Sequence, residues 1–321
     1  FCGTYSEDGN IFMSACQDGM LRLYDARGSE FRLTAAVQAR DVGWAIVDTC
    51  YSPDQHFLIY SSWSHFVHLI TLDGSRHEAL DVAGDLAQAG SVCPFSIRFS
   101  NDSREIIGGT NHASIFIYDC VRDTRPVAIS AHEDDVNAVA FLDDSSNLFV
   151  TGSDDCLCKV WDRRIVDDER DEPVGVFRGH SHGITYIDPK GDGRHFISQS
   201  KDCSIKLWDL RRVCSARHTA APRVALSDYR WGISGRPQRQ LRDDTSLMTY
   251  RDHVVARTLI RARFSPEFST GQKYIYSGSA NGCIYVYDSL TGKVASRLKP
   301  HADTIVRDVS WHPFKPYIVS S

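Results

Sequence analysis

The sequence lacks the features that most often mark an enzyme, a metalloprotein or a membrane protein. None of its apolar runs is long enough to span a bilayer, and no signal peptide is present. It contains no glycine-rich phosphate loop, no Gly-x-Ser-x-Gly nucleophile elbow and no histidines at metal-ligand spacing. We therefore predict no catalytic residues, no bound metal and no cofactor.

The ten cysteines include no Cys-x-x-Cys pair, which argues against a metal site. Cys156 and Cys158 lie two positions apart, so on one strand they would point to opposite faces. Reduced, structural thiols suit the cytosol or nucleus, and we expect the protein in the nucleus and cytoplasm. The net charge of −5 is mild, so neither nucleic-acid nor membrane binding is predicted.

The sequence contains one motif that occurs twice between His132 and Arg212. Each copy has a histidine early, a Thr-Gly-Ser-Asp-Asp or Ser-Gln-Ser-Lys-Asp turn in the middle, and Trp-Asp near its end. The two tryptophans, Trp161 and Trp208, lie 47 positions apart. A repeat of about 40–45 residues with Gly-His early and Trp-Asp late is the signature of WD40 propeller blades, each a four-stranded antiparallel sheet.

The polar residues of the repeat predict a buried hydrogen-bond network in each blade. A histidine would donate to an aspartate, and the pair would position a hydroxyl and the tryptophan N–H. The predicted members are His132, Thr151 and Asp155 in the first copy, and His180, Ser198 and Asp202 in the second. An Asp–His–Ser grouping can also indicate a hydrolase. The repeat-equivalent positions and the missing nucleophile elbow favour the structural network.

The spacing of the third-strand anchors predicts the whole architecture. The anchors before the insertion are separated by 46, 48, 43 and 47 positions, and they are Tyr24, Ile70, Tyr118, Trp161 and Trp208. We predict an all-β, seven-bladed WD40 β-propeller that forms one domain over residues 1–321. The seventh blade, beginning at His301, is expected to be incomplete in this chain. Because the chain opens within a predicted strand, we also expect residues of the natural protein to precede Phe1.

The next anchor, Tyr287, lies 79 positions beyond Trp208, which indicates an insertion between blades five and six. This insertion, at about 211–257, carries ten arginines against four aspartates and no lysine. It is interpreted either as a solvated loop or as a docking surface for an acidic partner. A nucleic-acid patch is less favoured because nothing else in the chain is basic. We expect Leu247–Tyr250 to rejoin the propeller as the outer strand of blade five, with His253 in the histidine role of the next blade.

Two blades end in Trp-Asp-x-Arg, at residues 161–164 and 208–211, and Tyr24-Asp25-Ala26-Arg27 is a relaxed third copy. Tandem boxes of this kind resemble those of the WD-repeat substrate receptors of cullin-4 RING ubiquitin ligases. Residues 131–141, 246–251 and 307–313 narrow the resemblance to the cullin-four-associated factor eleven subfamily. The resemblance implies a non-catalytic recognition subunit. It would bind the ligase adaptor protein, and through it cullin-4, and present a protein substrate for ubiquitination and proteasomal degradation.

The resemblance also assigns roles within each box. Arg164 and Arg211 would contact the adaptor, Asp162 and Asp209 would hold the local turn, and Trp161 and Trp208 would pack the blade. The alternative for each arginine is a surface ion pair with its neighbouring aspartate, which contributes little to stability. The alternative function is that of a propeller that does not attach to a ligase. It would be a general scaffold in a signalling, RNA-processing or chromatin complex.

The loops that enter the first strands predict a substrate site on the opposite rim. Arg40, Arg261 and Arg307 each lie at or close to the start of a first strand in a different blade. Three guanidinium groups around one opening would favour a short acidic peptide, because arginine binds carboxylates in bidentate fashion. The competing interpretation is that Arg40 and Arg307 simply pair with Asp41 and Asp308.

Overall fold

The computed structural model describes residues 2–84, 91–122, 126–166, 172–214, 241, 243–299 and 304–321. The chain divides into two compact units. The first unit contains Phe1–Val139 and Ser310–Val319, and the second contains Ala140–Val166, Glu172–Val309 and Ser320–Ser321. Within the described residues the strands form six four-stranded sheets and one two-stranded sheet.

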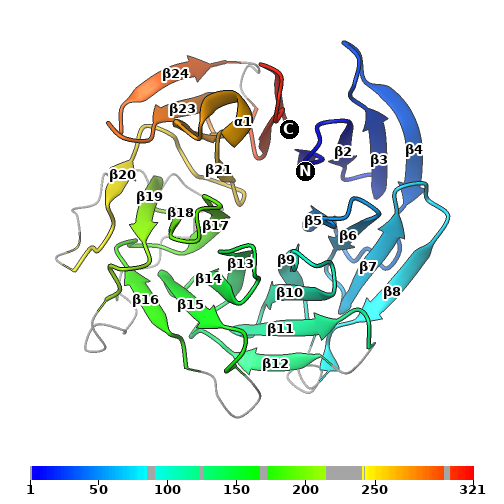
Figure 1. Cartoon of the computed structure of the whole chain (residues 1–321), viewed down its shortest axis with the longest axis horizontal. Coiled ribbons are helices and arrows are strands. Elements are labelled where there is room, and N and C mark those ends of the chain that lie inside the picture. The colour runs from blue at the N-terminus through cyan, green and yellow to red at the C-terminus, as the bar shows by residue number, and fades with distance from the viewer. Residues whose placement is uncertain are drawn as a thin grey trace. The chain divides into compact units, whose positions relative to one another are not determined.

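Three of the four-stranded sheets belong to the first unit, and in each the strands pair in chain order (Figure 1). Their strands are β1 (Cys2–Tyr5), β2 (Ile11–Ala15), β3 (Met20–Asp25) and β4 (Arg32–Gln38); β5 (Asp48–Tyr51), β6 (Phe57–Ser61), β7 (Phe66–Thr71) and β8 (His77–Asp81); β9 (Pro94–Phe99), β10 (Glu105–Thr110), β11 (Ser114–Asp119) and β12 (Val127–Ser130). The β5–β8 sheet forms although its third strand ends in Ile70-Thr71 instead of Trp-Asp.

The second unit follows the same plan. The chain enters it along β13 (Val136–Phe141), and its other strands are β14 (Leu148–Ser153), β15 (Leu157–Asp162) and β16 (Gly175–Arg178); β17 (Ile184–Pro189), β18 (His195–Ser200), β19 (Ser204–Asp209) and β20 (Met248–Tyr250); β21 (Ala262–Phe264), β22 (Tyr274–Ser277), β23 (Ile284–Asp288) and β24 (Val294–Leu298). The last two strands of the chain, β25 (Val309–Trp311) and β26 (Ile318–Ser320), make the two-stranded sheet.

The turns between first and second strands in the first unit share one local device. A serine hydroxyl donates to the aspartate two residues later and accepts the amide of the second strand, which closes the turn without a long loop. The serine-to-aspartate distances are 2.6, 2.5 and 2.6 Å, for Ser6–Asp8, Ser52–Asp54 and Ser100–Asp102. This Ser-x-Asp pattern is why short polar runs between apolar strands become tight turns.

In the second unit, a glycine in or directly after the second strand of a sheet lies close against a neighbouring segment of the chain. A Cβ atom added at Gly152 would lie 2.6 Å from Cγ2 of Ile184. At Gly278, directly after β22, it would lie 2.2 Å from the carbonyl oxygen of Val306, which precedes β25. The glycine of the repeat is thus required by packing, and the apolar core lies between neighbouring sheets.

Several sequence predictions can be compared with these sheets. The all-β class is confirmed, and the part of the chain that the structure describes adds one short helix, α1 (Glu267–Thr270), that the sequence did not predict. The predicted outer strand at Leu247–Tyr250 is confirmed as β20, which pairs with β19. The described residues form six complete four-stranded sheets, so a count of seven blades is not confirmed. His301 and residues 215–240 of the insertion lie outside the described residues.

Candidate functional site

The third strands β15 and β19 each bury a tryptophan next to their last residue. Trp161 and Trp208 are fully buried, and each indole N–H donates to a hydroxyl on the second strand of the same sheet. The distances are 2.9 Å from Trp161 Nε1 to Thr151 Oγ1 and 2.7 Å from Trp208 Nε1 to Ser198 Oγ. These bonds fix the strand ends, and with them the direction in which the following Asp-x-Arg leaves the sheet.

Around the β17–β20 sheet the structure brings the three predicted network residues together with Trp208. His180 Nε2 lies 2.8 Å from Ser198 Oγ, and Nδ1 lies 3.0 Å from a carboxylate oxygen of Asp202. Because Nδ1 faces the carboxylate, it carries the proton and donates, while Nε2 accepts from the serine. The chain of donors therefore runs from Trp208 through Ser198 and His180 to Asp202, and every member is buried.

The environment of Asp202 shows how this buried charge is tolerated. Burial alone would raise the pKa of the carboxyl group. The interaction with His180, with hydrogen bonds from the Ser204 hydroxyl and the Ser181 amide, lowers it well below its usual range instead. The connectivity is that of a hydrolase triad, but Ser198 is fully buried and already accepts the N–H of Trp208. This geometry supports strand positioning.

The predicted residues of the first copy fall in different units. Thr151 and Asp155 lie in the second unit, where Thr151 accepts the Trp161 N–H and Asp155 accepts the Leu157 amide at 3.0 Å. His132 is buried in the first unit.

The first box holds its arginine by a bidentate ion pair. Arg164 Nε and Nη2 lie 2.9 and 2.6 Å from the two carboxylate oxygens of Asp162, which also accepts the Arg164 backbone N–H. Hydrogen bonds from this side chain and backbone lower the pKa of Asp162 below its usual value. The Arg164 side chain is nevertheless 63% exposed. The predicted ion pair is therefore present, and it aims an accessible guanidinium group outward.

The second box differs in how its aspartate is shared. Asp209 is buried and receives a bidentate contact from Arg194, at 2.5 and 3.0 Å. Arg211 lies farther away, at 3.3 Å, and its side chain is 68% exposed. Arg211 is thus held more loosely than Arg164. The relaxed copy in the first unit repeats the tighter geometry, with Arg27 Nη2 2.6 Å from Asp25 and a 70% exposed side chain.

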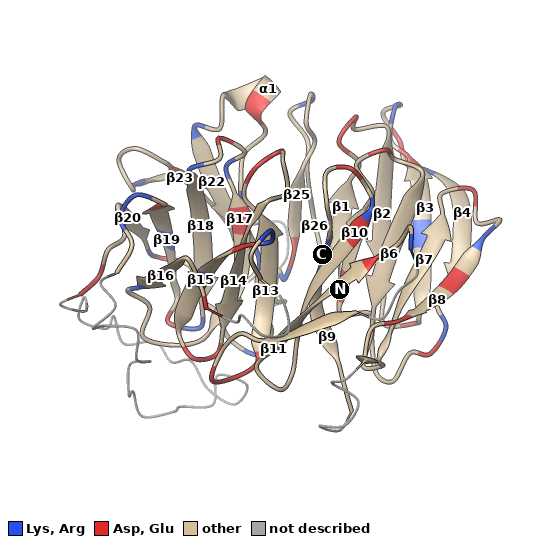
Figure 2. Cartoon of the chain, turned by 60° about the horizontal axis from the view of Figure 1, so that its bottom comes forward, with Lys and Arg blue, Asp and Glu red and all other residues tan. Residues whose placement is uncertain are grey.

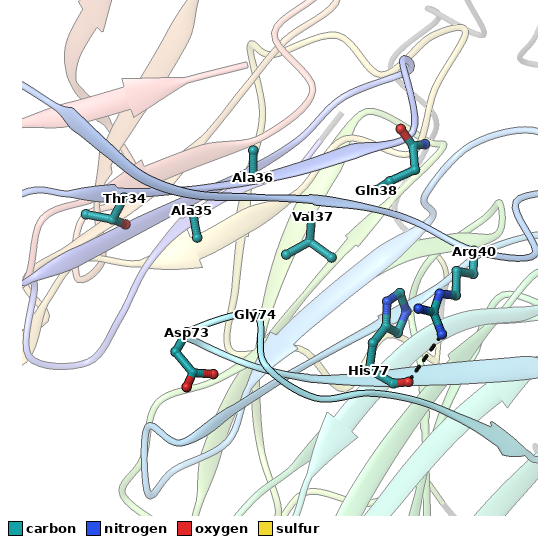
Figure 3. A pocket seen from close by; sticks show the side chains of 9 residues that line it. All are labelled: Thr34, Ala35, Ala36, Val37, Gln38, Arg40, Asp73, Gly74 and His77. Carbon is teal, nitrogen blue, oxygen red and sulfur yellow. Dashed lines mark hydrogen bonds between the residues drawn. The ribbon is translucent and has the colours of Figure 1, made fainter.

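The three predicted substrate arginines lie in different settings. Arg40, in the first unit, donates to the carbonyl oxygen of His77 at 3.4 Å, at the end of a pocket of about 570 Å³ (Figure 3). Arg261, in the second unit, is buried and lies 3.4 Å from Asp308. Arg307 accepts the backbone N–H of Arg261 through its own carbonyl oxygen. The structure thus brings Arg261 and Arg307 together.

Both aspartates of the competing interpretation contact further side chains. Asp308 receives the guanidinium of Arg263 at 3.0 Å as well as that of Arg261. Asp41 lies 3.2 Å from Nε2 of His68. One carboxylate therefore faces two guanidinium groups, and it offsets the positive charge of Arg261 only in part.

Comparison with known proteins places this chain. Residues 124–162 and 171–209 match the family "WD domain, G-beta repeat". A LEC14B homolog from Prunus armeniaca is 42% identical over 337 residues, covering 100% of this chain and 70% of the relative. The LEC14B protein of Lithospermum erythrorhizon is 43% identical over 334 residues, with the same two coverages. The chain belongs to the LEC14B family of WD-repeat proteins.

Relatives from nematodes have a more explicit name. A "DDB1- and CUL4-associated factor 11 homolog" from Caenorhabditis elegans is 37% identical over 338 residues, covering 100% of this chain and 59% of the relative. The resemblance to the cullin-four-associated factor eleven subfamily, which residues 131–141, 246–251 and 307–313 indicated, is confirmed.

Two exposed tryptophans of this LEC14B-family chain were not among the sequence-predicted site residues. Trp44 is 72% exposed and Trp63 is 51% exposed, whereas the box tryptophans are buried. In the sequence these two tryptophans differ from the box tryptophans because no aspartate follows them. The spacing of the repeats, however, does not predict whether a side chain is exposed. Among the described residues no three His, Cys, Asp or Glu side chains are placed to hold a metal ion. Within the same residues no helix is long and apolar enough to cross a membrane.

Proposed function

We propose that this chain is the substrate-recognition subunit of a cullin-4 RING E3 ubiquitin ligase. Its tandem boxes would bind the ligase adaptor, the DDB1 of the relatives' name, and so connect the chain to cullin-4. The observation that carries the proposal is the presence of two exposed box arginines. Arg164 and Arg211 follow the third strands of consecutive sheets, and both side chains are about two-thirds exposed.

The geometry supports this role through preorganisation. Each buried tryptophan fixes a strand end, and each aspartate holds a guanidinium group before any partner arrives. A partner would then lose little side-chain entropy from Arg164 on binding. Two N–H groups of Arg164 face Asp162, and the fork geometry leaves others to donate to carbonyl or carboxylate oxygens of an adaptor. The chain itself would supply binding, and the ligase would supply the chemistry.

We also propose that the complete fold has seven blades. The pair β25–β26 would be the start of the seventh, with its further strands supplied by residues outside this chain. Closing the ring in this way would cover strand edges that otherwise invite aggregation.

The substrate site is proposed at a separate set of arginines. A protein substrate held through an acidic peptide at Arg40, Arg261 and Arg307 stays a prediction. Its weakest member is Arg261, which is buried against Asp308. Localisation in the nucleus and cytoplasm is part of the same proposal, because a cullin-4 receptor must meet its ligase there.

The test is co-purification of the adaptor and cullin-4 with the full-length protein from cells. The variant Arg164→Ala/Arg211→Ala should lose both, and its Tm should stay close to that of the wild type because the lost ion pairs are exposed. Arg27→Ala is the matched control, since it removes the same ion pair outside a Trp-Asp box. Undiminished adaptor recovery with the double variant would favour the general scaffold instead.

A further inference from the structure

The first unit contains a groove along β4, the outer strand of its sheet. Figure 3 shows the side chains around this pocket of about 570 Å³. Residues Thr34–Gln38 of β4 form one side, and Asp73 and Gly74, in the turn between β7 and β8, form the other. A Cβ atom at Gly74 would lie 3.6 Å from Cγ2 of Val37, so the turn lies directly against the strand. We call this pocket the β4 groove.

One edge of β4 has no strand partner among the described residues. Its other edge pairs with β3, and directly after β4 the N–H of Ala39 donates to the carbonyl oxygen of Gly19 at 2.8 Å. Backbone groups alternate in direction along an antiparallel ladder. The backbone N–H and C=O of Ala36 and Gln38 therefore point away from β3, toward the outer edge. These groups can pair with a further strand.

Arg40 places a positive charge at one end of the β4 groove. Its backbone N–H donates to the Tyr60 hydroxyl at 2.8 Å, and its guanidinium group donates to the carbonyl oxygen of His77 at 3.4 Å. No carboxylate of the described residues lies within ion-pair distance of Arg40, and that of Asp41 faces Nε2 of His68 at 3.2 Å. The other N–H groups of the exposed Arg40 side chain can therefore donate to a bound carboxylate.

Asp73 places a negative charge at the opposite end (Figure 3). Its Oδ1 accepts hydrogen bonds from the Thr71 hydroxyl and from the amide and hydroxyl of Ser75. These bonds lower the pKa of Asp73 to about 2, so the carboxylate is charged at neutral pH. Its second oxygen, Oδ2, has no partner among the described residues and can accept from a bound cation. Between the two charges the lining residues Ala35–Val37 are small and apolar.

A free strand edge with a charge at each end matches an extended peptide. Such an edge binds a peptide as an additional strand, with affinity from main-chain hydrogen bonds and specificity from alternate side chains. Opposite charges at the two ends favour a segment that carries the complementary charges in one order. Antiparallel pairing is more stable than parallel pairing, and it places the N-terminal part of the segment beside Arg40.

We propose that the β4 groove binds an extended segment of a partner protein, which pairs antiparallel with β4 and carries an acidic residue before a basic one. The acidic side chain meets Arg40, and the basic side chain meets Asp73. This site needs neither Arg261 nor Arg307, and it adds a fixed order of charges to the expected acidic peptide. Only the interpretation of the segment as part of a ligase substrate rests on the proposed function.

Two fluorescent peptides of equal composition and opposite order test the proposal. They are Glu-Val-Thr-Val-Thr-Lys and its reversal Lys-Thr-Val-Thr-Val-Glu, each acetylated and amidated so that the termini carry no charge. The full-length protein should bind the first peptide severalfold more tightly than the second, and salt should reduce this preference. Equal affinity, the opposite preference, or binding of neither peptide would overturn the proposal.

Variants of the protein then locate the preference. Arg40→Glu makes both ends of the β4 groove negative, so it should abolish the preference between the two peptides. Asp73→Asn keeps the Oδ1 acceptor of the turn and should reduce the preference by itself. The matched control is Arg76→Glu/Glu78→Arg, which exchanges the charges of an exposed ion pair outside the lining and should leave the preference unchanged. A preference that survives Arg40→Glu, or that disappears in the control, would contradict the assigned ends.

N-methylated peptides test the strand pairing without any change to the protein. In a strand that pairs along one edge, the N–H groups of alternate residues face the partner strand. Methylation of the two valine nitrogens and methylation of the two threonine nitrogens should therefore act unequally on the first peptide. One form should lose about tenfold in affinity and the other should bind like the parent. Equal binding by the two forms would overturn the strand pairing.

The readouts also separate this proposal from the proposed function. Arg40→Glu should retain adaptor co-purification, and Arg164→Ala/Arg211→Ala should retain the peptide preference. Failure of the wild-type protein to co-purify the adaptor would end the ligase proposal and leave the β4 groove standing. Loss of the peptide preference in the folded box variant would contradict a separate site in the first unit.

Discussion

At the scale of single residues, different sheets use different side chains to hydrogen-bond the buried aromatic residue of the third strand. The β21–β24 sheet has Tyr287 where the preceding sheet has Trp208, and the phenol oxygen lies 3.0 Å from Nδ1 of His253. Asn281 stands at the turn position of Asp202, so His253 gains no carboxylate of its own. Burial therefore dominates, offset only in part by Asp202, and lowers the pKa of His253 to about 4.

This histidine predicts a loss of stability in mild acid. A histidine with an ordinary pKa of 6.5 that falls to about 4 on folding binds its proton better when the chain is unfolded. Its contribution is complete above pH 6.5 and is lost as the pH falls from 6.5 toward 4. Urea unfolding across this range should show the loss, and His253→Gln should show a shallower pH dependence. Identical slopes in both proteins would remove His253 as the cause.

The buried network makes a second prediction at this scale. Ser198→Ala would leave both the Trp208 N–H and Nε2 of His180 without their shared partner inside the core. We expect the free energy of unfolding to fall by about 2 kcal/mol, the cost of a buried unsatisfied polar group. Chemical denaturation measures this, with Ser296→Ala on the exposed face of β24 as the control. A change no larger than that of the control would contradict the network.

At the scale of elements, the outer strand β20 depends on a buried ion pair. Lys206 on β19 is buried, and its ammonium group lies 2.5 Å from Asp244 and 2.9 Å from Thr249 Oγ1. Asp244 and Thr249 belong to the segment that returns from the arginine-rich insertion. The ion pair therefore joins residues near the end of the insertion to β19. It lies close to β20, whose three residues pair with β19 through the backbone.

Lys206→Met should release this strand. The variant keeps the side-chain volume but leaves the Asp244 carboxylate buried without its cation, which costs about 3–5 kcal/mol. Hydrogen exchange should show faster exchange at Met248–Tyr250 than at β17 and β18. Lys206→Met/Asp244→Asn should recover part of the lost stability, because no unpaired charge remains. Unchanged protection of β20 in the single variant would refute the fastening role.

How far the sequence predicted these elements depends on how local each feature is. The anchor spacing predicted even the β5–β8 sheet, where Ile70 replaces tryptophan, because strand pairing repeats at nearly constant separation. The hydrogen bonds of His180, Ser198 and Asp202 lie within one repeat and follow from the motif. Contacts between residues distant in sequence, such as Lys206 with Asp244 or Arg261 with Asp308, have no fixed spacing.

Exposure was the least predictable property of the candidate sites. Arg261 lies at the start of a first strand, as predicted, yet its side chain is turned inward and buried. Trp44 and Trp63 belong to a residue type that is usually buried, but their loops leave them open. Many charged residues gather in turns and loops, with α1 beyond the strand ends of its own sheet (Figure 2).

At the scale of the whole molecule, the proposed seventh blade makes a testable prediction. The relatives extend beyond the matched region, since this chain covers 70% of the LEC14B proteins. A longer protein that supplies the remaining strands should aggregate less than residues 1–321 alone, because paired edges cannot recruit other chains. Light scattering at equal concentration compares them. Equal aggregation of the two proteins would argue against edge closure by added strands.

The proposed function assigns adaptor binding to the two Trp-Asp-x-Arg boxes of the second unit. The most direct test is the Kd of the purified full-length protein for the purified adaptor. Arg164→Ala and Arg211→Ala should each weaken binding, and the double variant should weaken it by about tenfold or more, while Arg27→Ala should leave it unchanged. A Kd that is the same for the wild type and the double variant, in folded protein, would contradict the central claim.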